Sequence, residues 1–260
     1  MRKLMEEEKN EAVIFRIALT AGELLIKNGA EMHRTEETIL RICSSHGITG
    51  LAVFITPSVI LIGNDKKEGS TYIKNIKVRG SNIHKISLVN EFSRNFTQGK
   101  ISENEALEIL KNIDAEKGYP YWLVLTTSGI ACGLFSVLLG GTLNDFIVTF
   151  LATFVAVFSN DKIAQFSKTV FLGNFIAGFF VGITTILFYH IGFVKNLDMI
   201  IVGAVLSLVP GVAFTSGIRD FILGDLVSGI ARTCEAVLIA VAIAFGIGSV
   251  LFGYSLLGGI

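Results

Sequence analysis

The chain has 260 residues, of which 51% are hydrophobic, and its mean hydropathy is +0.62. This composition excludes a disordered chain and is high for a soluble protein, and the net charge of zero excludes a strongly basic nucleic-acid-binding protein. The three cysteines, Cys43, Cys132 and Cys234, lie far apart without a CxxC motif, which excludes a disulfide scaffold and a thiolate zinc site.

Charged residues are unevenly distributed along the chain. Residues 1–118 contain 17 of the 22 basic and 16 of the 22 acidic residues, whereas residues 119–260 contain long uncharged stretches. This change predicts a hydrophilic domain over 1–118 and a transmembrane domain over 119–260. The expected fold class is an α-helical integral membrane protein with an N-terminal α+β domain.

The hydrophilic domain shows both helical and strand patterns. Apolar spacing predicts helices over 11–29, 35–46 and 83–96, and the capping box at 102–105 predicts a last helix to about residue 116. Residues 48–62 are rich in Val, Ile and Phe with an interruption at Thr56-Pro57, which indicates two strands joined by a turn. Residues 71–78 are a third candidate strand.

This domain carries no recognisable catalytic motif. His33, His46 and His84 stand without a metal-ligating partner at helical spacing, which is typical of surface or core histidines. The chain lacks GxSxG, Walker and HExxH motifs. We therefore expect no catalytic residue, metal or cofactor, no enzymatic activity, and no ATP-driven pumping by this chain itself.

Five stretches of the second half predict transmembrane helices. A span requires roughly 20 predominantly apolar residues to cross about 30 Å of hydrocarbon. Four stretches meet this length plainly, and the second meets it only with its flanking residues. The predicted spans lie near residues 119–139, 142–159, 170–192, 198–216 and 235–255.

Basic residues in the connections predict the orientation in the cell membrane. Lys162, Lys168, Arg219 and Arg232 lie in connections on one side, and Lys195 lies on the other. The hydrophilic domain is therefore expected to be cytoplasmic and the C-terminus external.

Pro210 and Gly211 interrupt the predicted fourth span. Proline removes a backbone donor, and the freed carbonyl groups require protein or a water-filled cavity around them. The half-helix after Pro210 would direct its positive N-terminal end at an anionic group, and Ser207 and Thr215 could supply hydroxyl groups nearby. The alternative interpretation is a plain proline kink.

Charged residues alternate with apolar ones after this interruption. Asp225 and Arg232 are seven residues apart and share a helical face, and Arg232 and Glu235 could pair. Asp220 or Asp225 could carry a proton if burial raised its pKa. The alternative is an interfacial loop with solvated charges.

In the third span, Asn174 either faces a path or only hydrogen-bonds another helix. The candidate residues of a substrate or ion path are Asn174, Ser207, Pro210, Gly211, Thr215, Arg219, Asp220, Asp225, Arg232 and Glu235.

Four segments of the chain resemble the threonine/serine exporter family, specifically its half-length members. They are GELLIKNGAEMHRTEETI (22–39), FITPS (54–58), NIHKISLVNEFSRNF followed by GKISENEALEIL (82–110), and LVPGVAFTSGIRDFILGDLVSGIARTCEA (208–236). The resemblance implies a soluble domain plus five spans, and a small, apolar second membrane subunit as partner. It also implies export driven by the proton gradient, of threonine and serine in some branches and of dicarboxylates such as succinate in others.

Three hypotheses about function follow. The first is a subunit of a secondary, proton-coupled exporter of small carboxylate-bearing metabolites. The others are a membrane-anchored enzyme, or a sensor or scaffold, with its active part in residues 1–118. The interrupted fourth span and the charged stretch after it favour the exporter, because an anchor needs neither. A homo-oligomer is the alternative to a second subunit, since two-fold symmetry could supply the other wall of the path.

Overall fold

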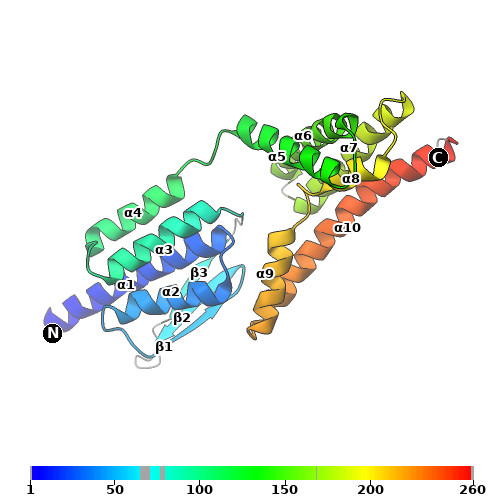
Figure 1. The fold of residues 1–260 in the computed structure, drawn as a ribbon. Coiled ribbons are helices and arrows are strands. Elements are labelled where there is room, and N and C mark those ends of the chain that lie inside the picture. The colour runs from blue at the N-terminus through cyan, green and yellow to red at the C-terminus, as the bar shows by residue number, and fades with distance from the viewer. Residues whose placement is uncertain (1, 65–70, 77–79, 168, 259–260) are drawn as a thin grey trace. The chain divides into compact units, whose positions relative to one another are not determined.

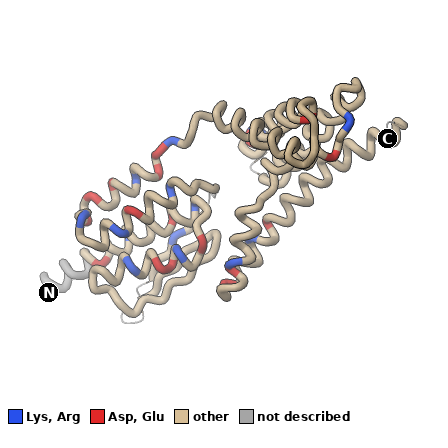
Figure 2. The backbone as a smooth tube through the Cα atoms, viewed as in Figure 1, with Lys and Arg blue, Asp and Glu red and all other residues tan. Residues whose placement is uncertain are grey.

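The computed structural model describes residues 2–64, 71–76, 80–167 and 169–258. The chain forms two compact units, one of residues 1–117 with 215–233 and one of residues 118–214 with 234–260. Figure 2 shows that most of the Lys, Arg, Asp and Glu residues belong to the first unit. The composition predicts that residues 215–233 belong to the domain 119–260. In the structure they pack with the hydrophilic part of the chain.

The first unit combines helices with an antiparallel sheet in the order β1-β2-β3 (Figure 1). Its elements are α1 (Arg2–Lys27), α2 (Met32–Ser44), β1 (Leu51–Ile55), β2 (Val59–Asn64), β3 (Thr71–Asn75), α3 (Ile83–Thr97) and α4 (Glu103–Ala115). The predicted helices and the first two strands are confirmed. The predicted capping box is present, with Ser102 and Glu105 bonding to each other's backbone amides. The third predicted strand covers 71–75, and residues 77 and 78 of that prediction lie outside the described residues.

A single apolar core holds the first unit together. Ile17, Ala21 and Leu25 recur at helical spacing on α1, and Ile60 and Ile62 alternate on β2, so that each element buries one face. Burying an Ile or Leu side chain fully stabilises the fold by roughly 1.5–3 kcal/mol. This core therefore holds α1 against the sheet.

Gly29 allows the sharp turn between α1 and α2. Its φ of +89° lies in the left-handed region, which glycine adopts without the steric cost of a Cβ atom. The amide of Ala30 donates to the Leu25 carbonyl at 2.9 Å, which closes α1, and α2 begins at Met32. The amide of Gly80, from a later segment of the chain, donates to the Lys27 carbonyl at 2.8 Å and stabilises the turn.

The second unit is built from apolar helices. Its elements are α5 (Tyr121–Leu138), α6 (Leu143–Ser167), α7 (Val170–His190), α8 (Leu197–Val205), the start of α9 (Gly211–Ile222) and most of α10 (Leu226–Leu256). Among the described residues, α5, α6, α7 and α10 are long and apolar enough to cross a membrane. Four of the predicted spans are therefore matched by helices of suitable length and composition.

The predicted fourth span, 198–216, is not one continuous helix. Helix α8 has nine residues, which is about 13.5 Å of helix, or about half of the hydrocarbon thickness. The interruption predicted at Pro210 is present, and α9 begins at the next residue. Pro210 disfavours a helical conformation of the preceding residue, Val209. The carbonyl of Pro210 accepts a hydrogen bond from the Phe214 amide at 3.0 Å, which closes the first turn of α9. The prediction of five spans is thus not confirmed.

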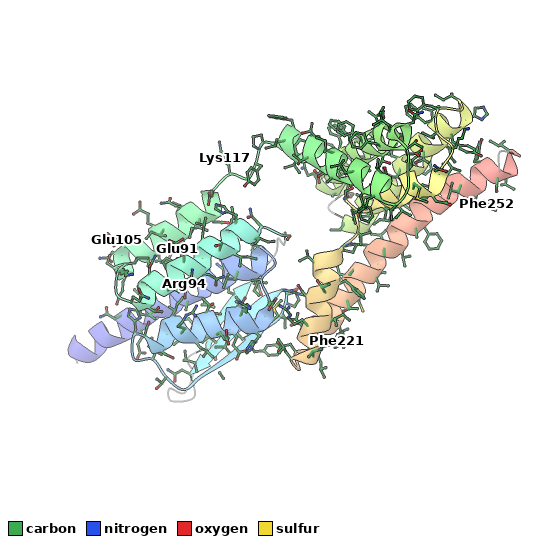
Figure 3. The ribbon with its side chains drawn as sticks, viewed as in Figure 1. Glu91, Arg94, Glu105, Lys117, Phe221 and Phe252 are labelled. Atoms are coloured by element: carbon green, nitrogen blue, oxygen red, sulfur yellow. The ribbon has the colours of Figure 1, made fainter. Side chains whose placement is uncertain are left out.

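Small residues let α7 approach α10 closely. A Cβ atom on Gly246 of α10 would lie 2.2 Å from the Phe175 carbonyl oxygen, and one on Gly178 of α7 would lie 2.6 Å from the Ile243 carbonyl oxygen. Such backbone proximity is typical of helix packing in membranes. Phe252, also on α10, is exposed (Figure 3).

Candidate functional site

Three segments that are distant in sequence meet in the first unit. They are residues 29–34, which form the turn after α1 and the start of α2 (the 29–34 turn), the end of β1 at Ile55, and the helical hairpin 215–233, which comprises the end of α9 and the start of α10. Each of them lies within one of the segments that carry the family resemblance. The site is therefore formed by the hydrophilic unit and the charged stretch that follows the Pro210 interruption.

The hairpin 215–233 is tightly closed. Gly224 has a φ of +90° and ends α9, and the amide of Asp225 donates to the Asp220 carbonyl at 2.9 Å before α10 begins. A Cβ atom on Gly229 would lie 2.9 Å from the ring of Phe221, which is labelled in Figure 3. This close packing holds the two helices of the hairpin against each other.

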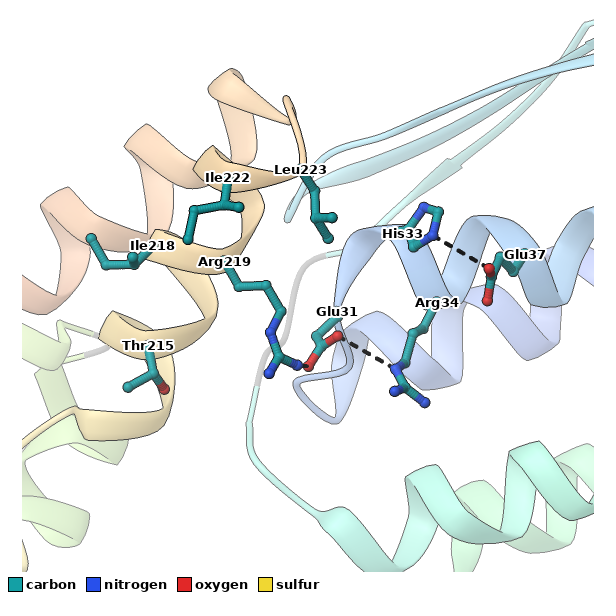
Figure 4. A pocket seen from close by; sticks show the side chains of 9 residues that line it. All are labelled: Glu31, His33, Arg34, Glu37, Thr215, Ile218, Arg219, Ile222 and Leu223. Atoms are coloured by element: carbon teal, nitrogen blue, oxygen red, sulfur yellow. Dashed lines mark hydrogen bonds and ion pairs between the residues drawn. The ribbon is translucent and has the colours of Figure 1, made fainter.

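The outer part of the site is a group of two arginines and one carboxylate. Glu31 forms an ion pair with Arg219 of α9, and its Oε2 lies 3.5 Å from Nε of Arg34 (Figure 4). The side chain of Glu31 is 23% exposed, whereas those of Arg219 and Arg34 are 56% and 72% exposed. Such exposed pairs contribute little to stability, about 0–1 kcal/mol each. Because each pair contributes so little, another ion can replace one of its members at a small cost in stability.

The inner part of the site is the buried Asp220. Its carboxylate Oδ2 lies 3.6 Å from Nε of Arg232, and Nη2 of Arg232 donates to the Ala30 carbonyl at 2.8 Å. Among the residues that the structure describes, neither carboxylate oxygen of Asp220 has a hydrogen-bond partner of good geometry, although the backbone amide of Met32 lies near enough to act on its charge, and the residue is fully buried. A buried carboxylate with so few partners is costly to keep charged.

Several charges act on the protonation of Asp220. Burial raises its pKa above the usual value, and the negative charges of Asp225 and Glu31 act in the same direction. Arg232 and the backbone amide of Met32, at the start of α2, lower it. Burial is the largest of these effects, so the net direction is upward.

A third contact joins the hairpin to the sheet. Ser228, in the first turn of α10, donates to the carbonyl of Ile55 at 3.4 Å, and its side chain is buried. The distance is at the long end of the hydrogen-bond range. With the contacts of Arg219 and Arg232, it holds the hairpin at three points.

An open pocket of about 770 Å³ lies beside the outer group (Figure 4). Its wall combines charged side chains from α2 with charged and apolar side chains from α9. The lining residues are Glu31, His33, Arg34, Glu37, Thr215, Ile218, Arg219, Ile222 and Leu223. His33 and Glu37 pair with each other at 3.3 Å, one helical turn apart.

The residues predicted for a substrate or ion path are divided between the two units. Thr215, Arg219, Asp220, Asp225 and Arg232 belong to the first unit and surround the site described above. The other predicted residues, in the second unit, are Asn174, Ser207, Pro210, Gly211 and Glu235.

Within the second unit, Asn174 is buried and bonds to its neighbours. Its Nδ2 donates to the Val170 carbonyl at 2.9 Å, and its Oδ1 accepts from Asn160 Nδ2 at 3.5 Å. Ser207 donates to the Ala204 carbonyl at 3.0 Å, just before the interruption at Pro210. These contacts satisfy the two side chains locally.

Sequence reasoning did not predict a role for Glu31, His33, Arg34 or Glu37. Glu31 and Arg34 entered only as carriers of the family resemblance, and an amphipathic helix start with mixed charges resembles any solvated surface. The pattern around Asp220 predicts a position in or near the membrane, so it gives no indication of a contact with the hydrophilic domain. No local signal in the sequence joins residue 31 to residue 219.

Comparisons with known proteins agree with the resemblance seen in the sequence. Residues 16–253 match the family model described as "Putative threonine/serine exporter". The chain is 24% identical over 253 residues to "Probable succinate transporter subunit YjjP" of Escherichia coli, covering 94% of this chain and 95% of that protein. It is 22% identical over 255 residues to "Threonine/serine exporter" of Corynebacterium glutamicum, covering 94% of this chain and 52% of that protein. No solved structure matches the chain.

Proposed function

Because the chain belongs to the threonine/serine exporter family, we propose that it is a subunit of a secondary, proton-coupled exporter of small carboxylate-bearing metabolites. The names of its relatives refer to threonine and serine in one case and to succinate in the other. A carboxylate is the chemical group that these compounds share. The observation that carries the proposal beyond the family is the buried Asp220 beside Arg232.

Asp220 is the proposed proton carrier. A carboxyl group must release and take up a proton at working pH, which requires a pKa above the ordinary value. Burial raises the pKa of Asp220, and Arg232 offers a charge partner for the ionised form. Asp225, which precedes α10 and is half-buried, is the second candidate.

The substrate path is proposed to pass the interrupted helix. The amides at the start of α9 follow Pro210 and Gly211, and the positive end of a helix favours an anion. Ser207 and Thr215 flank this start, and Asn174 adds a buried amide on α7. In this proposal, the carboxylate of the metabolite approaches the start of α9.

We propose that the first unit lies in the cytoplasm and that the C-terminal end of α10 lies outside the cell. Four crossings would be made by the long apolar helices, and the fifth by the discontinuous stretch 197–214. The distribution of Lys and Arg in the connections supports this orientation. The pairing of the hairpin 215–233 with the hydrophilic unit supports it as well, because both must then be on one side.

The proposed partner is a second, small and apolar membrane subunit. The Escherichia coli relative, which has nearly the same extent, is named a subunit, whereas this chain covers about half of the Corynebacterium glutamicum exporter. One half of a path needs a second wall. A second copy of the same chain is the other arrangement that could supply it.

The test is export from a bacterial strain that lacks related exporters. Intracellular and external succinate and threonine are measured with the chain alone, with the candidate small subunit alone, and with both. We expect export only with both, and loss of export when the proton gradient is collapsed. Export of neither compound class with both subunits present at normal abundance would refute the proposed function. Full export by this chain alone in liposomes would refute the two-subunit arrangement and favour a homo-oligomer.

A further inference from the structure

We propose that Arg34 and Arg219 form a binding site for the carboxylate of a small metabolite, and that Glu31 occupies this site until the metabolite replaces it. The proposal rests on the proposed function, because it names the place where the metabolite first binds. It concerns the pocket of the first unit, apart from the path at the interrupted helix.

The contacts of Glu31 show what the two arginines can hold. One carboxylate lies between two guanidinium groups, with Oε1 on Nη1 of Arg219 and Oε2 toward Nε of Arg34 (Figure 4). A guanidinium has five N–H donors, and Glu31 contacts one nitrogen atom of each arginine. The donors of the two groups together suit one planar carboxylate, that of Glu31 or that of a metabolite in its place.

The charges of the pocket favour an anion at this position. Arg34 and Arg219 are opposed at this position by the single negative charge of Glu31, and the carboxylate of Glu37, 3.3 Å from His33, lines the pocket as well. The group of three therefore carries a net charge of about +1. Because a neighbouring apolar wall lowers the local dielectric, such a charge acts more strongly there than in bulk water.

The size and lining of the pocket suit a small metabolite. Its volume of about 770 Å³ exceeds what a compound of a few carbon atoms needs, and it is open to solvent. Ile218 and Ile222 of α9 and the following residue, Leu223, form its apolar side. The carboxylate would lie at the arginines, and the carbon chain would lie along these side chains.

Replacement of Glu31 would change the contacts of the hairpin. Arg219 belongs to α9, whereas Glu31 and Arg34 belong to the turn and to α2, so the Glu31–Arg219 pair connects the two parts. A metabolite carboxylate between the arginines would replace this direct contact by one that runs through the metabolite, and would leave the contacts of Arg232 and Ser228 in place. Binding would thereby alter the surroundings of Asp220, toward which the charge of Glu31 acts.

Glu31 competes with the metabolite as a tethered carboxylate. A group attached to the same chain has an effective concentration in the millimolar range or above. Removing it should therefore tighten metabolite binding, by about tenfold if its two contacts with the arginines are together worth about 1.4 kcal/mol. An ordinary structural ion pair would show the opposite result, because its loss would only weaken the site.

The experiment measures binding by titration calorimetry to the full-length chain in detergent, with sodium succinate and with L-threonine. We expect Glu31→Gln to tighten binding of at least one compound about tenfold, and Arg34→Gln to weaken it about tenfold or more. Arg34 is 72% exposed, so its replacement should leave the fold intact. Dimethyl succinate, which lacks the charges, should not bind.

Two matched variants serve as controls. Glu36→Gln changes a carboxylate on α2 that does not line the pocket, and Arg94→Gln changes an exposed arginine on α3. Both should bind like the unchanged chain. If Glu31→Gln weakens binding, or if Arg34→Gln leaves it unchanged, the proposed site is refuted. Export of a carboxylate compound by the unchanged pair of subunits would then still support the proposed function, whereas absence of export would refute that function separately.

Discussion

Nη2 of Arg232 donates a hydrogen bond of 2.8 Å to the backbone carbonyl of Ala30, a residue 202 positions earlier in the chain. Nε of the same guanidinium lies 3.6 Å from Oδ2 of the buried Asp220. One side chain at the start of α10 thus both holds the hairpin to the 29–34 turn and neutralises the buried charge.

Replacing Arg232 by Gln should destabilise the first unit by about 3 kcal/mol, because it leaves Asp220 buried without a cation. The double variant Asp220→Asn with Arg232→Gln should lose less than the sum of the single variants, since neither charge then remains unpaired. Thermal or denaturant unfolding of the full chain in detergent measures these free energies. Additive losses would mean that the two side chains do not interact.

The stability of the chain should depend on pH through Asp220. Its pKa is raised in the folded chain, mainly by burial, so the folded state binds more protons than the unfolded state between the two pKa values. The contribution of Asp220 to stability is therefore greatest at low pH and is lost as pH rises through the folded value. Comparing melting temperatures from pH 4 to 8, Asp220→Asn should gain stability relative to the unchanged chain as pH rises. A constant difference would contradict the raised pKa.

Export should require a titratable group in the hairpin. We expect Asp220→Asn, which keeps the size and removes the proton-binding charge, to abolish efflux at normal membrane abundance. Asp225→Asn should have the smaller effect, since Asp225 is less buried. Asp114→Asn, which changes the exposed partner of Lys27, is the matched control and should export normally. Wild-type rates from both hairpin variants across pH 6–8 would exclude both residues as proton carriers.

The contact between α7 and α10 should not tolerate a side chain at Gly246. The Cβ atom of Gly246→Ala would lie 2.2 Å from the Phe175 carbonyl oxygen and 2.8 Å from the Phe179 amide nitrogen, and backbone atoms cannot rotate away. We expect a loss of several kcal/mol and a sharp fall in membrane abundance. Gly248→Ala, two residues later, places its Cβ atom in open space and should be tolerated.

The proposed orientation can be tested by labelling single cysteines in a variant whose three native cysteines are replaced by Ser. Asn10→Cys should be protected from an impermeant maleimide in intact cells, and Leu257→Cys should be labelled. Both side chains are exposed in the structure, so burial would not explain protection. Labelling of position 10 from outside would contradict the cytoplasmic position of the first unit.

Local patterns determined much of the fold. The capping box of Ser102 and Glu105, the helix ends near Gly29 and the long apolar helices all depend on residues a few positions apart, so they can be read from the chain. The interruption at Pro210 belongs to the same group, because proline acts on its immediate neighbours. Apolar composition alone, however, did not distinguish the nine-residue α8 from a full span.

Only the tertiary structure decided which charges share a site. Helix periodicity grouped Asp225 with Arg232 on one face, but it contains no information about a partner 202 residues away. The packing of the hairpin 215–233 against the first unit brings Arg219 to Glu31 and Arg232 to Ala30. It also buries Asp220, and that burial raises its pKa. Burial and long-range pairing depend on how separate elements pack, and no single stretch of sequence specifies that.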